Sequence, residues 1–331
     1  MTRRQPGILT MRWFARFAAV AFTALFASAA LAQSYPDRPI RLLVAFPPGG
    51  GANFVARLVA QLLSAQLGQA VVVENRPGSN GNFAGEMVAH AAGDGYTILQ
   101  SAGSLFTVNP HLYAKMPFDP LKTLLPVATI TSDELLLTEN PALEPKNFRD
   151  FIDYARRAKP PLLYGSIGNG SEHHLAMELL KEQAGIQMTH VPYRGGGPAA
   201  LGVMGGEVAV MFGGGSATPL VQAGKLRALA ISGRKRSPLF PDLPSISEIY
   251  PAYDVTIWQG LFVPTATPPA VIARLRAAVN AVVGQREFAE KLAAAGSGEP
   301  FATGPDAMVA LIHADSDRFG KVVRASGLKV E

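Results

Sequence analysis

Residues 40–68, IRLLVAFPPGGGANFVARLVAQLLSAQLG, contain the pattern that decides the fold. The apolar run at 40–46 predicts a β-strand, which enters a loop rich in proline and glycine. Apolar residues then return at helical spacing from Val55 to Leu67, and Gly68 predicts the end of that helix. Glycines let backbone N–H groups approach a ligand, and the N-terminus of a helix favours negative charge. The stretch therefore predicts a cradle for an anion.

The loop matches neither of the common phosphate-binding motifs. No lysine follows the glycines, which excludes a P-loop. Gly49 and Gly51 fit the dinucleotide fingerprint, but Phe54 stands where its third glycine is required. We therefore expect an anion other than a nucleotide phosphate.

Length and composition narrow the functional classes. The chain has 331 residues, enough for about two domains, and 48% of them are hydrophobic. It has no cysteine, which excludes disulfides, thiolate nucleophiles and cysteine-rich zinc sites. His173 and His174 are neighbours, but successive helix positions point about 100° apart, and no HExxH pattern exists. We expect no metal, no cofactor and no catalytic residues.

The N-terminus has the anatomy of a secretory signal peptide. A basic segment precedes the apolar run AAVAFTALFASA at 18–29, and Ala30 and Ala32 form an Ala-x-Ala cleavage site. We expect residues 1–32 to be removed by cleavage after Ala32; an uncleaved membrane anchor is the alternative, and Met11 is an alternative start. Cleavage removes four arginines and lowers the net charge from +5 to +1, so a nucleic-acid partner is not expected.

Strand-like and helix-like segments alternate along the rest of the chain, which predicts an α/β architecture with mainly parallel sheets. A second unit of strand, glycine loop and helix begins at residue 162, with Ser171 as N-cap and Gly185 as the end of its helix. Two such units predict two similar lobes that present loops to a shared cleft. The other expected strands are 70–75, 96–101, 188–193, 208–213 and 225–232, with helices at 82–92 and from 268 to 329, the latter broken at AGSGEP.

Longer motifs carry a resemblance to a known family. The sequence resembles the extracytoplasmic solute receptors of tripartite tricarboxylate transporters, the Bug or TctC-like family, over nearly the whole mature chain. The matching motifs, in order, are YPDRPIRLLVAFPPGG, VVVENRPGSNGN, DGYTIL, NPHLYAKMPFDPLKTLLPVA, YGSIGNGSEHHLAMELLKEQAG, HVPYRGGGPAALGVMGGEV, AGKLRALAISGRKRSPLFPDLPS and TIWQGLFVP.

The resemblance implies a two-lobed periplasmic binding protein of the flytrap type, which closes on a small organic carboxylate. It implies a monomer in the periplasm that passes its cargo to a two-component integral membrane permease. The second lobe is inserted in the first, so we expect lobe 1 at 33–135 and 236–331 and lobe 2 at 136–235, with crossings near 135 and 235.

For the first lobe, the resemblance implies ligand contact by Phe46, Gly50 and Asn53; the alternative for Asn53 is an ordinary N-cap. Ser101 and Ser104 follow a strand, where a hydroxyl either binds a carboxylate or is merely solvated. Trp258 is expected either as a wall of the cleft or in the core.

For the second lobe, the segment GNGSEHH is expected to supply the opposing half of the clamp. Asn169 and Ser171 are candidates there, and Ser171 is equally expected as a plain helix cap. His174 is expected as a neutral donor to a ligand oxygen or as a structural histidine, because the helix dipole disfavours its charged form. Tyr193 and Gly195 form the next candidate loop, and the neighbouring Arg194 is expected to be solvated.

The chain departs from the family pattern at three places. Asn53 stands where many members carry Asp, and Ala209 and the pair Gly213 and Gly214 replace the D-x-M-F-D-N pattern. Acidic or amide groups would be expected near an amino-acid ligand, and two glycines offer no side chain. The hypothesis is that the ligand, which Gly213 would contact, is a mono- or dicarboxylate without an amino group, with aromatic carboxylates among the candidates.

Two other functions remain as alternatives. An exported α/β hydrolase would need a nucleophile, but the G-x-S-x-G motif is absent, since Pro77 stands where PGSNG would need its first glycine. Scattered triads need not show in a sequence. A receptor that delivers its ligand to a periplasmic sensor domain would keep the same fold.

Overall fold

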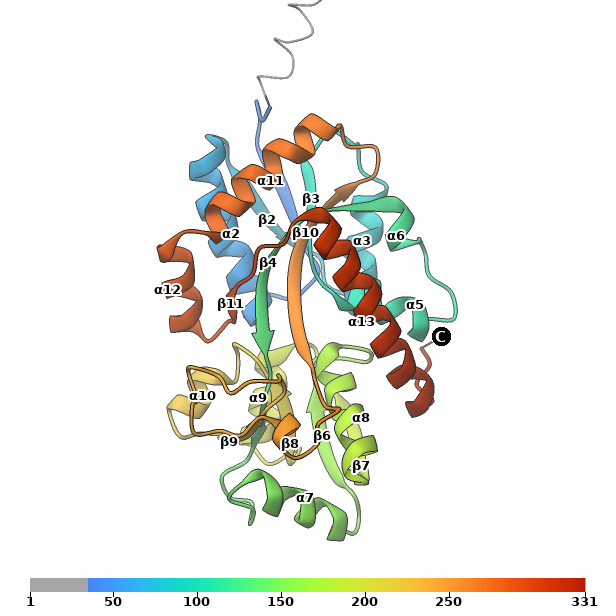
Figure 1. Cartoon of the computed structure of the whole chain (residues 1–331), viewed down its shortest axis with the longest axis vertical. Coiled ribbons are helices and arrows are strands. Elements are labelled where there is room, and N and C mark those ends of the chain that lie inside the picture. Colours follow the sequence, from blue (N-terminus) through green and yellow to red (C-terminus); the bar gives the residue numbers. More distant parts are fainter. Residues whose placement is uncertain (1–34, 331) are drawn as a thin grey trace, which may run out of the picture.

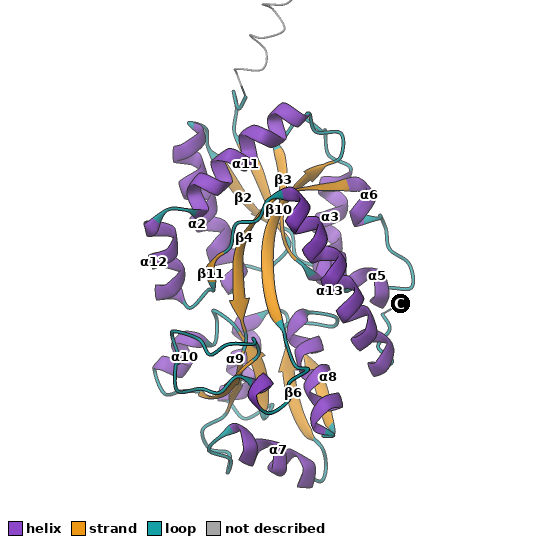
Figure 2. Cartoon of the chain, in the orientation of Figure 1, coloured by secondary structure: helices purple, strands orange, loops and turns teal. Residues whose placement is uncertain are grey.

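The computed structural model describes residues 35–330, so the predicted signal peptide lies outside the described residues. These residues form two lobes, each built on its own sheet with helices packed against it (Figures 1 and 2). Among them, no helix combines the length and the apolar character needed to cross a membrane.

The first lobe contains a six-stranded sheet in the order β11-β4-β10-β3-β1-β2. β1 pairs in parallel with β2 and β3, as the opening strand–helix pattern predicted, whereas β10 runs antiparallel to both β3 and β4. The strands are β1 (Ile40–Val44), β2 (Val71–Asn75), β3 (Thr97–Ala102), β4 (Leu124–Glu134), β10 (Thr256–Pro264) and β11 (Glu299–Pro300).

The second lobe contains a five-stranded sheet in the order β7-β6-β8-β5-β9. Here β6 is parallel to β7 and β8, and β5 is antiparallel to β8 and β9. The expectation of mainly parallel sheets is therefore wrong, because one strand that arrives from the other lobe enters each sheet against the local direction. The strands are β5 (Leu136–Glu139), β6 (Leu162–Ser166), β7 (Met188–Pro192), β8 (Val210–Gly213) and β9 (Arg227–Ile231).

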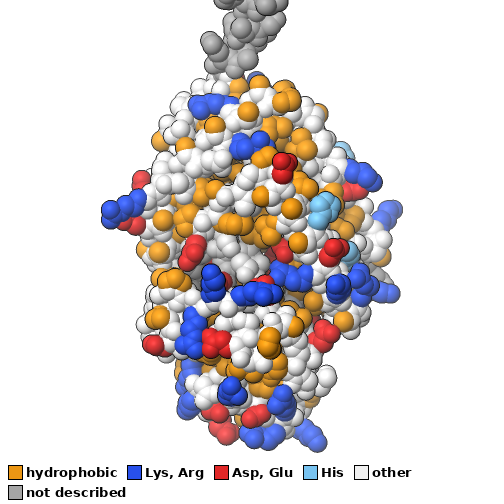
Figure 3. Space-filling view, in the orientation of Figure 1, with side chains coloured by type: hydrophobic (Ala, Val, Ile, Leu, Met, Phe, Trp, Pro, Cys, Tyr) orange, Lys and Arg blue, Asp and Glu red, His pale blue; other side chains and the backbone are white. Residues whose placement is uncertain are grey.

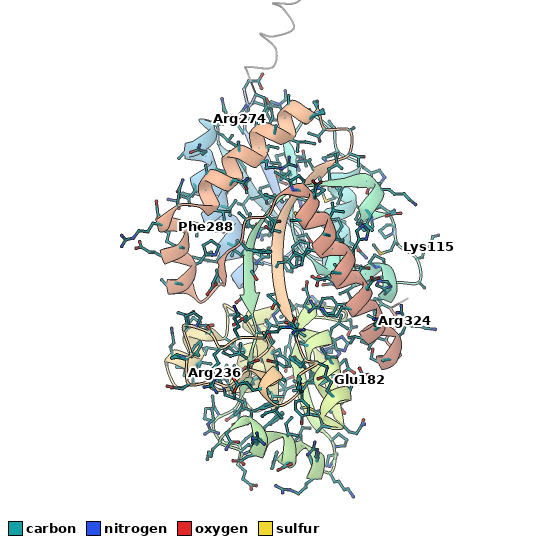
Figure 4. All side chains as sticks on the ribbon, viewed as in Figure 1. Lys115, Glu182, Arg236, Arg274, Phe288 and Arg324 are labelled. Carbon is teal, nitrogen blue, oxygen red and sulfur yellow. The ribbon has the colours of Figure 1, made fainter. Side chains whose placement is uncertain are left out.

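Amphipathic helices cover the sheets. The first long helix buries nine residues, among them Leu58, Leu62 and Leu63, and each fully buried aliphatic side chain stabilises the fold by about 1.5–3 kcal/mol. Phe288 turns inward from α12 into the same core (Figure 4). First-lobe helices are α2 (Gly51–Leu67), α3 (Asn82–Ala89), α4 (Ser104–Thr107), α5 (Asn109–Leu112), α6 (Pro120–Thr123), α11 (Pro269–Val283), α12 (Arg286–Ala295) and α13 (Pro305–Ser326); second-lobe helices are α7 (Phe148–Arg157), α8 (Glu172–Ala184), α9 (Gly196–Met204) and α10 (Thr218–Gln222), and the 3-10 turns are Ser79–Gly81 and Ile246–Glu248.

Three points of the chain are hydrogen-bonded where the lobes join. Leu135 separates β4 from β5, and its backbone N–H donates to Ser232 Oγ at 2.8 Å. The N–H of Ser232 donates to the carbonyl of Leu135, and its hydroxyl donates to the carbonyl of Val255 at 2.6 Å. Ile246 and Tyr253 pack in the core of the second sheet. We therefore propose that the second boundary between lobes lies nearer to residue 255 than to 235.

Helix α13 contacts both lobes (Figure 1). It packs on β4 and α4 of the first lobe and on α8 of the second. Its residues Phe319, Val322 and Val323 belong to the same buried cluster as Leu180 of α8. The C-terminal helix thus holds the two lobes together beside the crossing strands.

Candidate functional site

A cavity, partly open to solvent, lies between the lobes at the ends of the strands. We call it the cleft. Both units of strand, glycine loop and helix contribute to it. Its lining residues are Phe46, Pro47, Gly50, Gly51, Ala52, Ala102, Asp133, Ile257, Gln259 and Ser297 from the first lobe, and Ile167, Glu172, His173, Gly195, Gly196, Gly214, Gly215 and Ser216 from the second.

Three helices begin at the cleft. Gly50 is the N-cap of α2 and Gly195 is the N-cap of α9, and neither provides a side-chain cap. The first intrahelical bonds run from Phe54 to Gly50 and from Ala199 to Gly195, so the earlier N–H groups of both helices have no intrahelical acceptor. Helix N-termini also carry partial positive charge. The arrangement suits an anion, which the backbone can bind from both lobes.

Glycine is required at two points of these loops. Gly49 has a φ of +87° and Gly195 a φ of +115°, a region that side chains rarely adopt. Both residues turn the chain just before a helix that begins at the cleft. The glycine-rich loops are therefore needed for the backbone path that presents the N–H groups.

The second-lobe helix α8 begins with a different arrangement. The hydroxyl of Ser171 accepts a hydrogen bond from the N–H of His174 at 3.3 Å and donates to the carbonyl of Gly168 at 2.8 Å. Glu172 follows the cap and lines the cleft. One of its oxygens accepts a hydrogen bond from the backbone N–H of Ser104, in the other lobe, at 2.8 Å.

Burial favours the uncharged forms of the titratable groups in the cleft. Desolvation raises the pKa of Asp133 to about 8 and that of Glu172 to about 7. Desolvation lowers the pKa of His173 to about 4, so its imidazole is neutral at pH 7. No lysine or arginine is among the described residues that line the cleft. Attraction for an anion therefore comes from the backbone rather than from charged side chains.

The lobes touch across the cleft. A Cβ added to Gly215 would lie 2.4 Å from Ser297 Oγ of the first lobe, and one added to Gly195 would lie 3.0 Å from Pro47 Cγ. The amide of Asn80 donates to the carbonyl of Gly170, in the second lobe, at 2.9 Å. The structure thus represents a closed arrangement, in which small residues let the two halves meet.

Some of the predicted site residues lie at the cleft and others do not. Phe46, Gly50 and Gly195 line it. Those outside its lining are Asn53, Ser101, Ser104, Asn169, Ser171, His174, Tyr193, Gly213 and Trp258.

Asn53 is buried inside α2 and is not its N-cap. The helix begins two residues earlier, after Gly50, and the side-chain oxygen of Asn53 accepts a hydrogen bond from Asn75 Nδ2 at 2.9 Å. Asn75 also donates to the carbonyl of Phe46 at 2.9 Å. Asn53 and Asn75 therefore fix the loop from behind.

His174 is buried within the second lobe, where its ring stacks on that of His190 with centroids 3.7 Å apart. Its neighbour His173 points to the cleft instead. Trp258 is a core residue that donates to Asp315 Oδ2 at 2.8 Å. Tyr193 packs against α9, close to Gly202.

Ser101 and Gly213 are buried strand residues beside lining residues, whereas Asn169 is exposed. Ser104 contributes its N–H to Glu172. None of these four residues forms the wall of the cleft.

Sequence reasoning missed several lining residues, above all Asp133, Glu172 and Gln259. Asp133 is followed by Glu134 inside the largely apolar run PVATITSDELLL, and a carboxylate in such a run is a local signal of a functional group. Gln259 lies inside a strand, and only the sheet register brings it opposite Thr131 and next to the cleft. That information is not local in the sequence.

Comparison with known proteins agrees with this geometry. The family model for the tripartite tricarboxylate transporter family receptor, TctC, matches residues 55–328. Protein BugT of Bordetella pertussis is 34% identical over 312 residues, which cover 93% of this chain and 95% of BugT. An R. palustris protein, Rpa4515, solved with adipate, superposes with a TM-score of 0.86 at 33% identity and covers 89% of this chain and 99% of that one.

MatC of Rhodopseudomonas palustris, solved with bound malate, gives a TM-score of 0.80 at 30% identity and covers 87% of this chain and all of MatC. These matches confirm both the resemblance and the two-lobed binding-protein fold. The chain belongs to the tripartite tricarboxylate transporter receptor family, whose members are periplasmic solute receptors.

Proposed function

We propose that this receptor captures a small organic carboxylate in the cleft by lobe closure and delivers it to a two-component membrane permease. The observation that carries the proposal is the meeting of helix N-termini from both lobes at one cavity without a lining lysine or arginine. Such N-termini bind carboxylates through backbone N–H groups. Adipate and malate in two relatives support the same ligand class.

The proposed maturation follows from the N-terminal pattern. The receptor is exported, cleaved after Ala32 and works in the periplasm as a monomer. Delivery to a sensor domain instead of a permease is the alternative for its partner, and a permease pair encoded beside it would favour transport.

A hydrolase is the less favoured function, and one contact makes it worth stating. Ser166 Oγ lies 2.6 Å from His190 Nε2, which is the geometry of a nucleophile and its base. Ser166 is fully buried, and neither residue is among those that line the cleft. A substrate in the cleft would not reach this hydroxyl. We therefore propose that the protein is not an enzyme.

The structure removes one of the grounds for the hypothesis that the ligand lacks an amino group. It used Asn53 as a cleft residue, but this side chain is paired with Asn75 behind the loop. Gly214 does leave space in front of Asp133, whereas a Cβ added to Gly213 would lie 2.4 Å from Ala217 Cβ. We do not carry the hypothesis forward.

Thermal unfolding of the mature protein with a panel of carboxylates, including malate and adipate, tests the proposal. A bound carboxylate at 100 times its Kd should stabilise the protein by about 2.7 kcal/mol. Gly215→Ala should weaken every ligand, because its Cβ would collide with Ser297 Oγ of the other lobe. Gly304→Ala is the matched control, since Gly304 precedes α13 outside the cleft and nothing lies within 4 Å of its Cβ. No response of the wild type to any carboxylate would contradict the proposal.

A further inference from the structure

The cleft has two chemically different sides. One side consists of helix N-termini, which suit a carboxylate. The other contains the carboxyl of Asp133 beside the side chain of Gln259, on the two long strands that lead to the lobe junction. A ligand that is only an anion would leave the carboxyl of Asp133 without an opposite charge.

The register of strands β4 and β10 brings the residues of this second side together. Asp133 of β4 is opposite Ile257 of β10, and Gln259 lies two residues further along β10, so all three share one face of the sheet. All three line the cleft. Cα atoms of such diagonal neighbours lie about 7–8 Å apart. Asp133 and Gln259 can therefore contact the same small ligand.

Gln259 is oriented by its neighbour in the sheet. Gln100 Nε2 donates to Gln259 Oε1 at 2.7 Å and to the carbonyl of Ala52 at 3.0 Å. With its oxygen engaged, Gln259 is left with its amide N–H groups for other partners. It can donate to a ligand oxygen, whereas an ionised Asp133 can only accept.

Small residues keep the carboxyl of Asp133 accessible. A Cβ added to Gly214 would lie 3.1 Å from Asp133 Oδ2, and one added to Gly298 would lie 3.0 Å from Asp133 Cβ. A side chain at Gly214 would thus occupy the space in front of the carboxyl. Gly214, one of the two glycines that replace the family pattern, therefore opens this part of the cleft.

No described residue neutralises Asp133. Its side chain makes no salt bridge within residues 35–330. The charges that act on it are those of Glu134 and Glu299, which both raise its pKa. At pH 7 a pKa of about 8 leaves Asp133 largely protonated, and a positive group on a bound ligand would stabilise its ionised form.

Basic side chains do occur on the outer surface where the lobes meet (Figure 3). A second cavity there adjoins Asp133 from outside and is lined by Lys235 and Arg236, the latter on the loop after β9 (Figure 4). Arg236 is paired with Glu248 at 2.8 Å. Neither cation is among the charges that act on Asp133.

We propose that Asp133 determines ligand class: the cleft takes a carboxylate that also carries an ammonium nitrogen, which Asp133 binds while the helix N-termini bind the carboxylate. This inference rests on the proposed function and narrows its ligand. Asp133 contacts the nitrogen directly, and Gln259 binds an oxygen of the same molecule.

Isothermal titration calorimetry with matched ligands tests the inference. The probes are glutarate and adipate, their α-amino derivatives glutamate and 2-aminoadipate, and the ω-amino acids 5-aminopentanoate and 6-aminohexanoate. The wild type should bind at least one aminated probe tenfold or more tightly than the dicarboxylate of the same chain length. Asp133→Asn should remove that preference while it keeps or improves binding of the plain dicarboxylate.

Asp317→Asn is the matched control, because it makes the same substitution at an exposed carboxylate of α13 that does not line the cleft and is not among the charges that act on Asp133. It should leave the preference unchanged. If the wild type binds plain dicarboxylates at least as tightly as every aminated probe, or if Asp133→Asn keeps the preference, the inference is wrong and the proposed function stands. If neither class binds to the wild type, the proposed function itself fails.

Discussion

The two strand–loop–helix units of this receptor begin alike and are completed differently. The first presents α2 through Gly50, which offers no side chain to the free N–H groups. The second presents α8 through Ser171, whose hydroxyl caps the helix, and then places Glu172 and two histidines in its first turn. One unit thus leaves its backbone donors open, and the other occupies part of them with its own side chains.

This difference gives the two units different roles. The open N–H groups of α2 can bind an anion directly, because nothing in the loop competes for them. The first turn of α8 is committed to protein contacts, including the bond from Ser104 to Glu172 that crosses between the lobes. We therefore expect ligand affinity to depend mainly on the first unit, and the stability of the closed form mainly on the second.

The largest expected difference between the two units is a loss of stability when the pH is lowered. Burial, with smaller contributions from His190 and Lys181, lowers the pKa of His174 to about 3, and burial lowers that of His173 to about 4. Below pH 6.5 the histidines of the unfolded chain become protonated, while His173 and His174 of the folded protein stay neutral. The free energy of unfolding therefore falls as the pH is lowered towards their folded-state pKa values. Each histidine contributes about 1.4 kcal/mol per pH unit. Urea unfolding at pH 7.0, 5.5 and 4.5 measures the loss.

Comparing the wild type with His174→Gln isolates the contribution of His174 to stability. The comparison is needed because the raised pKa values of Asp133 and Glu172 change stability in the opposite direction as the pH falls. The free-energy gap between wild type and variant should shrink by about 1.4 kcal/mol for each pH unit below 6.5. Parallel curves for wild type and His174→Gln would contradict the expected role of burial.

The next effect removes one donor from the first unit. Gly51 is the first residue of α2, where proline fits the helix and lacks only the N–H. Gly51→Pro should weaken the best dicarboxylate by about ten- to a hundredfold, since a hydrogen bond to a charged group contributes about 1.5–3 kcal/mol. Gly51→Ala keeps the N–H, and its Cβ would make only ordinary contacts at 3.5 Å. Calorimetry that finds equal affinities for the two variants would show that this donor does not bind the ligand.

The same contrast explains what the sequence could predict. Ser171 and Gly185 were placed correctly as cap and end of α8, because capping depends on a few adjacent residues. Gly68 was correct at the end of α2 for the same reason. Local chemistry was also sufficient to find the two glycine loops that meet at the cleft.

The side chains of the cleft were harder to predict because they depend on tertiary placement. His173 and His174 are equivalent in the sequence, and the exact start of α8 decides which one points to the cleft. Asn53 is not the N-cap because α2 begins three residues earlier than that reading expected, and its side chain is bonded to Asn75. Asp133 and Gln259 meet only through the pairing of strands that are more than a hundred residues apart in the chain.

The smallest effect is expected from a substitution that gives α2 the same kind of N-cap as α8. Gly50 has φ −91° and ψ 168°, a conformation that serine adopts freely at an N-cap, and its Cβ would have no neighbour within 4 Å. In Gly50→Ser the hydroxyl should accept a hydrogen bond from the N–H of the second or third helical residue, as Ser171 does in α8. Stability should rise by only a few tenths of a kcal/mol, because glycine is itself an acceptable cap.

Affinity should move in the opposite direction. A ligand carboxylate must then displace the serine hydroxyl, so Gly50→Ser should bind several-fold more weakly than wild type. Gly50→Ala adds the same Cβ without an acceptor and should keep its affinity, which separates competition from crowding. A serine variant that is more stable yet binds as tightly as wild type would mean that the open N–H groups of α2 are not the ligand's donors. The two units would then differ in capping alone, and the functional contrast between them would have to be sought at Asp133.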